Sequence, residues 1–410
     1  MKKDNFKRIK SCRACGSNAL KMILDLGDQP LANSFLSFKS EEDNFPLQLN
    51  LCNECFHLQL SVVVNPSLMF ENYLYVSGTT STLKEYFKWF SKFALNDPFI
   101  KSLKRKPKVL DIACNDGSQL DQFQLNGCET YGVDPAANLT PIARDKGHQV
   151  FTKYWDIETS LKFQKNIEII VAQNVFAHVN DIVEFLKLCK NALHKKGKLY
   201  IQTSQANMIK NSEFDTIYHE HLSFFNIKSM YKTALRAGLS LVDIHKTNIH
   251  GTSYLFVLQN IEKTITTVAE NKMIAEKKDG LYNLSTYQKY SSNVQKIKKD
   301  FIKICMNLRD DGFKIIGYGA AAKGNTFLNF TKFHLDYIVD DNSLKQNLLT
   351  PGLNIPVLSP NELLKENPEL LCIVPLAWNF FDEIKCKVKA IIKCNPKFYL
   401  RYFPKTELVK

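Results

Sequence analysis

The sequence lacks any long apolar run. No stretch of roughly 18 consecutive apolar residues occurs, so we expect no membrane-spanning helix. The basic N-terminus has no apolar core of the kind that a secretory leader needs, so we expect a cytoplasmic protein. Internal repeats and low-complexity segments are also absent, which argues against solenoid and disordered arrays.

The composition is that of an ordinary globular protein with an excess of positive charge. A length of 410 residues indicates two or three domains, and 45% of the residues are hydrophobic. The net charge of +13 favours an anionic partner such as nucleic acid, a membrane surface or a phosphorylated small molecule. Because the basic residues are scattered along the chain, we expect no nucleic-acid partner, and we expect no membrane partner either. Solvated lysines that bind no partner are the alternative explanation of the charge. We expect a monomer or a homodimer.

Four of the eleven cysteines form two Cys-x-x-Cys pairs. These are Cys12 with Cys15 and Cys52 with Cys55, which predict a zinc ion held by four thiolates. Four thiolates leave no open coordination position, so we expect a structural zinc. Free or disulfide-bonded cysteines are the alternative, which a reducing cytoplasm disfavours.

Two stretches of the chain alternate strand-like and helix-like segments. The first holds KVLDIAC, ETYGVDP, IEIIVAQNV and KLYIQTS, and the second, beyond a Lys-rich helical stretch, begins with FKIIGYG. Such alternation predicts an α/β fold with parallel sheets and helices on both faces. We therefore expect a zinc-binding domain over residues 1–68, a first α/β domain over 69–260 and a smaller one over 261–410.

The segment VLDIACNDGSQL resembles a strand and turn of a nucleotide site. About twenty residues further on, Asp134 ends a second strand, where a carboxylate can accept hydrogen bonds from two ribose hydroxyls. The phosphate-binding G-x-G-x-x-G is missing from this turn, which favours an adenosyl ligand without a diphosphate, namely S-adenosylmethionine. The candidate cofactor-binding residues are Asp111, Asn115, Gly117, Asp134, Gln173, Asn174 and His178.

A second turn, GYGAAAKGNT, combines small residues with Lys323 and the start of a helix. Backbone N–H groups and one ammonium can bind a diphosphate there. A close-packed strand-to-helix turn is the alternative. The candidate substrate-binding residues here are Tyr318, Lys323 and Asn325.

The stretch YHEH gathers Tyr218, His219, Glu220 and His221. The two histidines are two residues apart, unlike the pair of an H-E-x-x-H zinc helix, and no third ligand is evident. A catalytic metal is therefore disfavoured, whereas a catalytic base with helpers and ordinary packed structure both remain open, the latter above all for His219.

These motifs resemble the bacterial C-methyltransferases that act on nucleotide-linked keto-deoxysugars. The likeness covers CRACGS, LDLGDQPLANSFL and CNECFHLQL, then DIACNDGSQL, YGVDPAANL and YHEHLSFF, and finally IIGYGAAAKGNTFLNF, VDDNSLKQNLLTPGLNIPV and PLAWNFFDEI. It implies an N-terminal zinc-binding module, a class I methyltransferase core and a C-terminal Rossmann-like domain. Ala113 departs from the glycine that is usual in the family, and this adds one methyl group to the turn.

The resemblance also implies roles for individual side chains. His221 would be the general base, Glu220 and Tyr218 would orient or polarise groups around it, and Tyr75, or its neighbour Tyr73, would donate toward an enolate. His250 and Gly251 resemble a turn that faces the sugar.

The sequence therefore predicts an enzyme that transfers a methyl group from S-adenosylmethionine to C3 of a nucleoside-diphosphate 4-keto-deoxysugar, after His221 removes the proton. The first alternative is an O- or N-methyltransferase acting on a related sugar. The second alternative, from another class, is a non-enzymatic zinc-containing nucleic-acid-binding protein.

Overall fold

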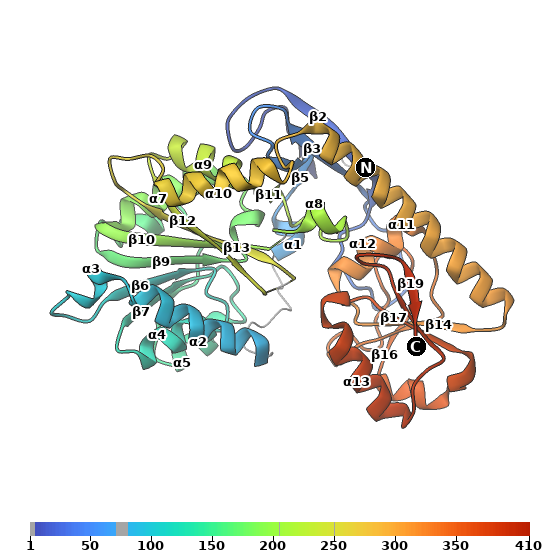
Figure 1. Cartoon of the computed structure of the whole chain (residues 1–410). Helices are drawn as coiled ribbons and strands as arrows, with labels where there is room; N and C mark the ends of the chain where they lie inside the picture. The colour runs from blue at the N-terminus through green and yellow to red at the C-terminus, as the bar shows by residue number, and fades with distance from the viewer. Residues whose placement is uncertain (1–4, 71–80, 205, 250) are drawn as a thin grey trace.

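A computed structural model describes residues 5–70, 81–204, 206–249 and 251–410 of the chain. Figure 1 shows three parts: a sheet domain with helices on both faces, a second sheet domain at the C-terminus, and a small N-terminal module between them. The long helix α11 (Leu284–Asp310) runs from the N-terminal module along the C-terminal domain.

The N-terminal module is made of short strands around the two cysteine turns. Its strands are β1 (Phe6–Arg8), β2 (Leu20–Gln29), β3 (Phe45–Cys52), β4 (Leu58–Leu60) and β5 (Val62–Val64). β1 pairs with β5, whereas β2, β3 and β4 form an antiparallel sheet. β4 takes its second neighbour from far along the chain, because β11 (Ser223–Phe224) pairs with it. The strand that directly follows the YHEH motif is thus part of the sheet of the N-terminal module.

The central domain is built on a seven-stranded sheet with the order β12-β13-β10-β9-β6-β7-β8. Its strands are β6 (Lys108–Ile112), β7 (Glu129–Val133), β8 (Gln149–Phe151), β9 (Ile167–Gln173), β10 (Leu193–Thr203), β12 (Ser240–Thr247) and β13 (Ser253–Gln259). The expected sheet was parallel, but β13 runs antiparallel to both neighbours. The reason is local: only five residues separate β12 from β13, which is too short for a crossover and forces a hairpin.

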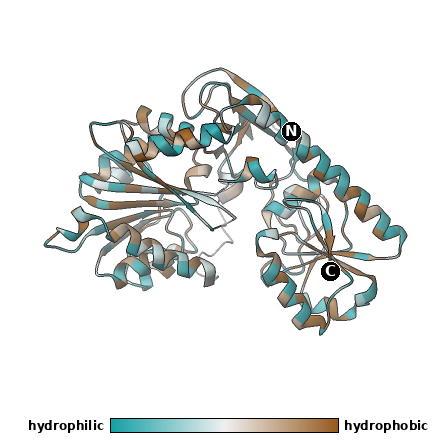
Figure 2. Ribbon diagram, viewed as in Figure 1, coloured by the Kyte–Doolittle hydropathy of each residue, from teal (hydrophilic) through white to brown (hydrophobic). Residues whose placement is uncertain are grey.

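Helices cover both faces of this sheet. α2 (Ser81–Leu95) buries Leu83, Tyr86, Phe87, Phe90 and Ala94, which lie at helical spacing. The remaining helical segments are α1 (Ser67–Phe70), α3 (Pro98–Lys101), α4 (Ser118–Leu125), α5 (Thr140–Asp145), α6 (Ile157–Leu161), η2 (Phe176–His178), α7 (Ile182–Ala192), α8 (Met208–Asn211), α9 (Ile227–Arg236) and α10 (Thr267–Lys278). Figure 2 shows both hydrophilic and hydrophobic residues along the longer helices of this domain.

The C-terminal domain has a six-stranded sheet with the order β16-β15-β14-β17-β18-β19. Its elements are β14 (Lys314–Tyr318), α12 (Ala322–Thr331), β15 (Ile338–Val339), β16 (Val357–Leu358), η3 (Pro360–Lys365), η4 (Pro368–Leu370), β17 (Leu371–Pro375), η5 (Trp378–Phe380), α13 (Phe381–Ile392), β18 (Phe398–Arg401) and β19 (Glu407–Val409). All pairings are parallel except the last, between β18 and β19.

Helix α11 connects the N-terminal module to the C-terminal domain. One face of it is buried at three- and four-residue spacing, from Tyr287 through Phe301 to Leu308. The same apolar cluster includes Leu49 of β3 and Phe327 of α12. α10, by contrast, packs against the central domain through Ala269. The domain boundaries expected near residues 68 and 260 stay predictions.

Candidate active site

Carboxyl groups gather at the carboxyl edge of the central sheet. The two carboxylate oxygens of Asp134, which follows β7, accept hydrogen bonds from the backbone N–H groups of Asn115 at 2.9 Å and Ala136 at 2.8 Å. Burial raises the pKa of Asp134, and burial together with Asp134 and Asp116 raises the pKa of Asp111 well above its usual range. Each oxygen of Asp134 can accept one further hydrogen bond, which suits two ribose hydroxyls.

The turn between β6 and α4 depends on left-handed backbone. Ala113 and Asn115 have φ values of 64° and 54°, and Gly117 has 78°. For alanine this conformation costs about 1–2 kcal/mol, so the cost of Ala113 lies in the backbone, beyond the added methyl group that the sequence suggested. A Cβ on Gly117 would lie 2.8 Å from the ring of His148 and 2.9 Å from Cβ of Ala143. The absence of a side chain at Gly117 thus lets the turn pack against its neighbours.

Two glutamines face each other across the ends of neighbouring strands. Gln173 ends β9 and is the register partner of Gln202 in β10. Within the described residues, neither side-chain amide has a hydrogen-bond partner for its buried nitrogen or oxygen, and the hydroxyl of the adjacent Thr203 has none either. Buried amides without partners are costly, so these atoms fit a site that a polar ligand completes. The sequence analysis proposed Gln173 but not Gln202. The available signal was a glutamine that directly follows the strand segment LYI.

The turn after β9 contacts the loop that carries the YHEH motif, residues 218–221. Asn174 is exposed with φ of 55°. Burial lowers the pKa of His178 to about 4, so its ring is neutral at physiological pH. The His178 and His221 rings meet edge to face, with centroids 4.9 Å apart. The N–H of Leu222 also donates to the carbonyl of Ala177 at 2.8 Å, which fixes the loop against this turn.

The imidazole of His221 is held in one tautomer. Its Nδ1 lies 2.7 Å from the carbonyl oxygen of Thr216, which can only accept, so Nδ1 carries the proton in the neutral ring. Nε2 therefore presents its lone pair, and the Tyr218 hydroxyl lies 2.9 Å from it. The ring is 7% exposed. A neutral imidazole with its basic nitrogen fixed toward a phenol can remove a proton.

Glu220 is a buried carboxyl with a partner that the sequence did not suggest. Its side chain is 6% exposed, and burial raises its pKa to about 7 against an opposing hydrogen bond from Asn33. The Asn33 Nδ2 donates to Oε1 at 2.6 Å across 187 residues of chain. A carboxyl with a pKa near neutrality can both accept and release a proton at physiological pH.

The raised pKa of Glu220 leads to a prediction about stability. Its folded-state pKa of about 7 lies above the ordinary 4.5, so the fold favours the protonated form. Ionising the buried carboxyl therefore lowers the free energy of unfolding. This loss is absent below pH 4.5, grows as the pH rises to 7, and reaches roughly 3 kcal/mol above that. We expect Glu220→Gln to be more stable than the wild type at pH 8, by up to this amount, and equally stable near pH 4.5. Urea unfolding at both pH values measures it, with the exposed Glu41→Gln as control; equal stability at pH 8 contradicts the prediction.

His219 packs as part of the N-terminal module. Its Nε2 donates to the carbonyl of Phe45 at 3.2 Å, and its ring meets the Phe45 ring edge to face at 5.8 Å. Burial lowers its pKa to about 4. The contacts therefore give His219 a structural role in the module interface.

Trp378 contacts two candidate residues and one buried carboxyl from different parts of the chain. Its indole N–H donates to Oδ2 of Asp215 at 2.7 Å, and the ammonium of Lys323 lies 4.9 Å above its ring. A Cβ on Gly251 would lie 3.8 Å from the same ring. Burial raises the pKa of Asp215 to about 6, while the charge of Lys323 opposes the rise. The sequence proposed Lys323 and Gly251 separately, and the structure brings them together around Trp378.

The other substrate candidates of the C-terminal domain make internal contacts. The Tyr318 hydroxyl donates to Asp341 Oδ1 at 3.0 Å. The Asn325 Nδ2 donates to the carbonyl of Ala32 at 2.8 Å, and its buried Oδ1 has no partner within the described chain. The turn after β14 repeats the arrangement after β6, because the N–H of Ala320 donates to Asp340 Oδ2 at 2.6 Å. Tyr75 and His250 lie outside the described residues.

The four predicted metal ligands meet in one place. The ligand atoms of Cys12, Cys15, Cys52 and Cys55 all lie within 4.8 Å of one another. The Sγ atoms of Cys12 and Cys55, and those of Cys15 and Cys52, are 3.6 Å apart. Tetrahedral zinc with sulfur ligands at about 2.3 Å requires separations of about 3.8 Å, so the cluster fits this ion. The cysteines also pack against the core of the central domain.

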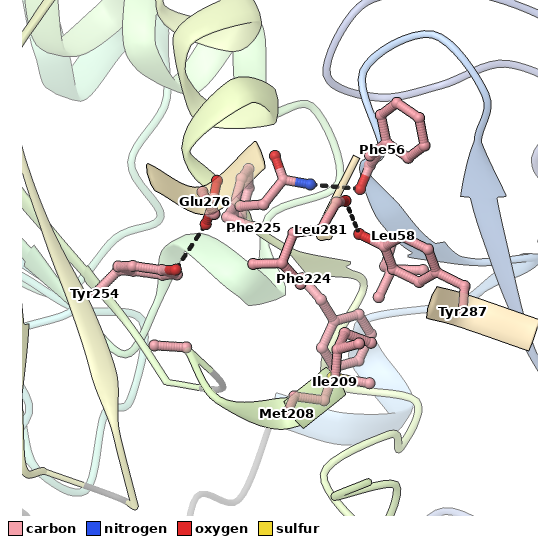
Figure 3. A pocket seen from close by; sticks show the side chains of 12 residues that line it. Phe56, Leu58, Met208, Ile209, Phe224, Phe225, Tyr254, Glu276, Leu281 and Tyr287 are labelled. Atoms are coloured by element: carbon pink, nitrogen blue, oxygen red, sulfur yellow. Dashed lines mark hydrogen bonds between the residues drawn. The ribbon is translucent and has the colours of Figure 1, made fainter. Parts of the chain in front are cut away.

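A separate pocket lies next to Phe224 and Phe225, which follow the YHEH motif. Figure 3 shows its lining, which comes from the N-terminal module, the central domain and α10–α11. Its acidic group, Glu276, accepts from the hydroxyls of Tyr254 at 2.6 Å and Tyr282 at 2.5 Å and from the N–H of Ile227 at 2.8 Å. These partners satisfy the carboxyl, so Glu276 serves to hold α10 against the sheet.

The sheet order, the adenosyl-type edge and the closed cysteine cluster define a class I S-adenosylmethionine-dependent methyltransferase with a zinc-binding module. Three family models match in succession: a putative zinc binding domain over residues 12–70, a methyltransferase domain over 83–244 and a C-methyltransferase C-terminal domain over 248–403. The chain thus carries a zinc-binding domain, a methyltransferase domain and a C-methyltransferase C-terminal domain in this order. It is a methyltransferase, so the expectation of a non-enzymatic protein, which the second alternative held, is wrong.

Several individual proteins are similar to this chain. The C-methyltransferase NovU of Streptomyces niveus is 26% identical over 409 residues, which cover 96% of each chain. A ubiquinone biosynthesis O-methyltransferase of Coxiella burnetii is 27% identical over 157 residues, 35% of this chain and 66% of that protein. Among solved structures, the CurJ carbon methyltransferase has a TM-score of 0.36 and 15% identity, over 45% of this chain and 56% of that one. Within the described residues, no helix combines the length and apolar character that a membrane crossing needs.

Proposed function

We propose that the enzyme methylates C3 of a nucleoside-diphosphate 4-keto-deoxysugar, with His221 as the general base. The observation that carries this proposal is the fixed tautomer of His221: the carbonyl of Thr216 holds the proton on Nδ1 and leaves Nε2 basic. The His221 ring meets the ring of His178, which lies just after the carboxyl end of β9. When bound at that edge, S-adenosylmethionine supplies an electrophilic methyl group on a sulfonium, and a nucleophilic carbon is what such a methyl group requires.

The ketone makes the C3 proton acidic. The C3–H bond breaks, its proton passes to Nε2 of His221, and its electron pair moves onto the ketone oxygen as an enolate. A neutral imidazole suits this task because its ordinary pKa lies near physiological pH. The imidazolium is stabilised by its hydrogen bond to the Thr216 carbonyl, and it returns the proton to solvent after methylation.

The enolate oxygen needs donors in a site that excludes water. The carboxyl of Glu220, with its pKa near 7, is able to donate there. The Tyr218 hydroxyl, which donates to Nε2 of His221 in the resting site, has to turn away before Nε2 takes the proton and can then donate to the enolate oxygen. Tyr75, which lies outside the described residues, is proposed as a further donor. The cofactor contacts are proposed for Asp111, Asn115, Gly117, Asp134, Gln173, Asn174 and His178, to which the unpaired amide of Gln202 adds a candidate on the same edge.

The nucleotide half of the substrate is proposed to bind at the C-terminal domain. Lys323 lies in the first turn of α12 and supplies one positive charge, and the N-cap Ala321 makes no side-chain hydrogen bond to the first turn. Gly251 lies close to Trp378, whose ring lies under the ammonium of Lys323. Tyr318, Asn325 and His250 remain candidates for the same half of the substrate. This placement supports a substrate that reaches from the C-terminal domain toward His221.

The proposal is tested by incubating the enzyme with a panel of nucleotide-linked 4-ketosugars in deuterated water. We expect deuterium at C3 of one of them before methyl transfer, because only carbon methylation requires an enolate. With labelled methyl donor, mass spectrometry and NMR of the product then locate the methyl group on C3. A methyl group on oxygen or nitrogen, without prior exchange at C3, contradicts the proposal and favours the O- or N-methyltransferase alternative.

A further inference from the structure

Residues 30–36, with the sequence PLANSFL, lie between the N-terminal module and the C-terminal domain. Leu36 and Leu349 exchange backbone hydrogen bonds of 3.0 and 2.7 Å. The carbonyl of Ala32 accepts the hydrogen bond from Asn325 of α12. A Cβ on Gly352 would lie 3.0 Å from the ring of Pro30. The C-terminal domain therefore holds this segment on both sides of its middle residue, Asn33.

From this position the side chain of Asn33 reaches the catalytic loop. Its Nδ2 donates to Oε1 of Glu220 at 2.6 Å. Asn33 itself is exposed, whereas Glu220 is buried. An amide that donates to Oε1 fixes the carboxyl plane and leaves Oε2 directed elsewhere, as a group that meets a substrate oxygen requires.

We propose that Asn33 is a positioning residue that holds the carboxyl of Glu220 for catalysis. This inference rests on the proposed function, in which Glu220 donates to the enolate. It also connects two parts of the substrate site: Lys323 and Asn325 share the first turns of α12, Asn325 holds Ala32, and the next residue, Asn33, holds Glu220. A nucleotide bound at α12 would thus steady the segment that orients the catalytic carboxyl.

The test is a double-mutant cycle of Asn33→Ala and Glu220→Ala, read as kcat and KM for the ketosugar that proves to be the substrate. Alanine at position 220 removes the oxygen that accepts from Asn33, whereas glutamine would keep one. Loss of one hydrogen bond corresponds to about tenfold in rate. We expect Asn33→Ala to lower kcat by about that factor with little change in KM, and to have almost no further effect in the Glu220→Ala background. Asn44→Ala is the matched control, because Asn44 is an exposed asparagine of the same module whose side chain donates to the nearby carbonyl of Glu42.

Equal losses from Asn33→Ala in both backgrounds, or a loss confined to KM, overturn the proposal. A second readout does not need turnover. The infrared difference between wild type and Glu220→Gln isolates the carboxyl band of Glu220, and Asn33→Ala should shift that band while Asn44→Ala should not. If no ketosugar is methylated, the proposed function fails. The infrared band still shows whether Asn33 donates a hydrogen bond to the carboxyl of Glu220. An unshifted band overturns the role of Asn33 even where methylation succeeds.

Discussion

Replacing His221 by Asn is expected to lower kcat about a thousandfold, because general base catalysis contributes roughly 10²–10⁴ and asparagine supplies no basic nitrogen. The asparagine amide can still donate toward the carbonyl of Thr216, so the loop should keep its position. Binding of S-adenosylmethionine should fall much less than kcat, because most of its proposed contacts lie at the ends of β6, β7 and β9, although the ring of His178 meets that of His221. Single-turnover rates and calorimetric titration of the cofactor measure the two effects separately.

His219→Asn is the matched control for this experiment. His219 is the neighbouring histidine of the same motif, but it packs on Phe45 and makes no contact with the His221 ring among the described interactions. Its replacement should lower stability and leave kcat per folded molecule nearly unchanged. If His221→Asn retains a rate close to that of the wild type, another group removes the proton and the proposed base is wrong.

Removal of zinc is expected to abolish turnover, although a closed four-thiolate site has no catalytic position. Structural zinc contributes roughly 10–16 kcal/mol of binding free energy, which is comparable to the whole stability of a domain. Loss of the metal should unfold the module that carries β4. Because β11 pairs with β4, the YHEH loop, residues 218–221, then loses the strand pairing that supports it next to His221.

The experiment compares Cys52→Ser with Cys394→Ser, which changes an exposed cysteine outside the cluster. We expect Cys52→Ser to lose bound zinc and at least about a hundredfold in activity, whereas Cys394→Ser should keep both. Affinity for S-adenosylmethionine should fall much less than activity, because the cofactor edge belongs to the central sheet. Full turnover by metal-free protein would show that the module does not support the loop.

The part of the site that the sequence predicted comes from short motifs. The spacing within CRAC and CNEC indicates a metal pair, and the four cysteines do meet. The strand KVLDI, its turn and Asp134 indicated an adenosyl site, and the backbone contact between Asn115 and Asp134 joins them at one sheet edge. The cysteine cluster is confirmed because metal-ligand spacing is encoded within a few neighbouring residues, whereas the roles of the adenosyl-site residues stay predictions.

The contacts that the sequence did not suggest join distant segments. Asn33 and Glu220 are 187 residues apart, and Asp215 and Trp378 are 163 apart. Gln202 appeared as an ordinary strand residue until its register with Gln173 placed two unpaired amides together. The roles of all these residues in catalysis and binding stay predictions.

The sequence by itself determined the element types, the zinc ligands and the presence of a methyltransferase core, because periodicity, cysteine spacing and turn chemistry are local properties. Only the tertiary structure decided that β11 completes the sheet of the zinc module, that Asn33 reaches Glu220, and that His221 holds its proton on Nδ1. These features depend on how three domains pack together. Packing is set by the combined burial of surfaces from distant segments, which no short stretch of sequence specifies.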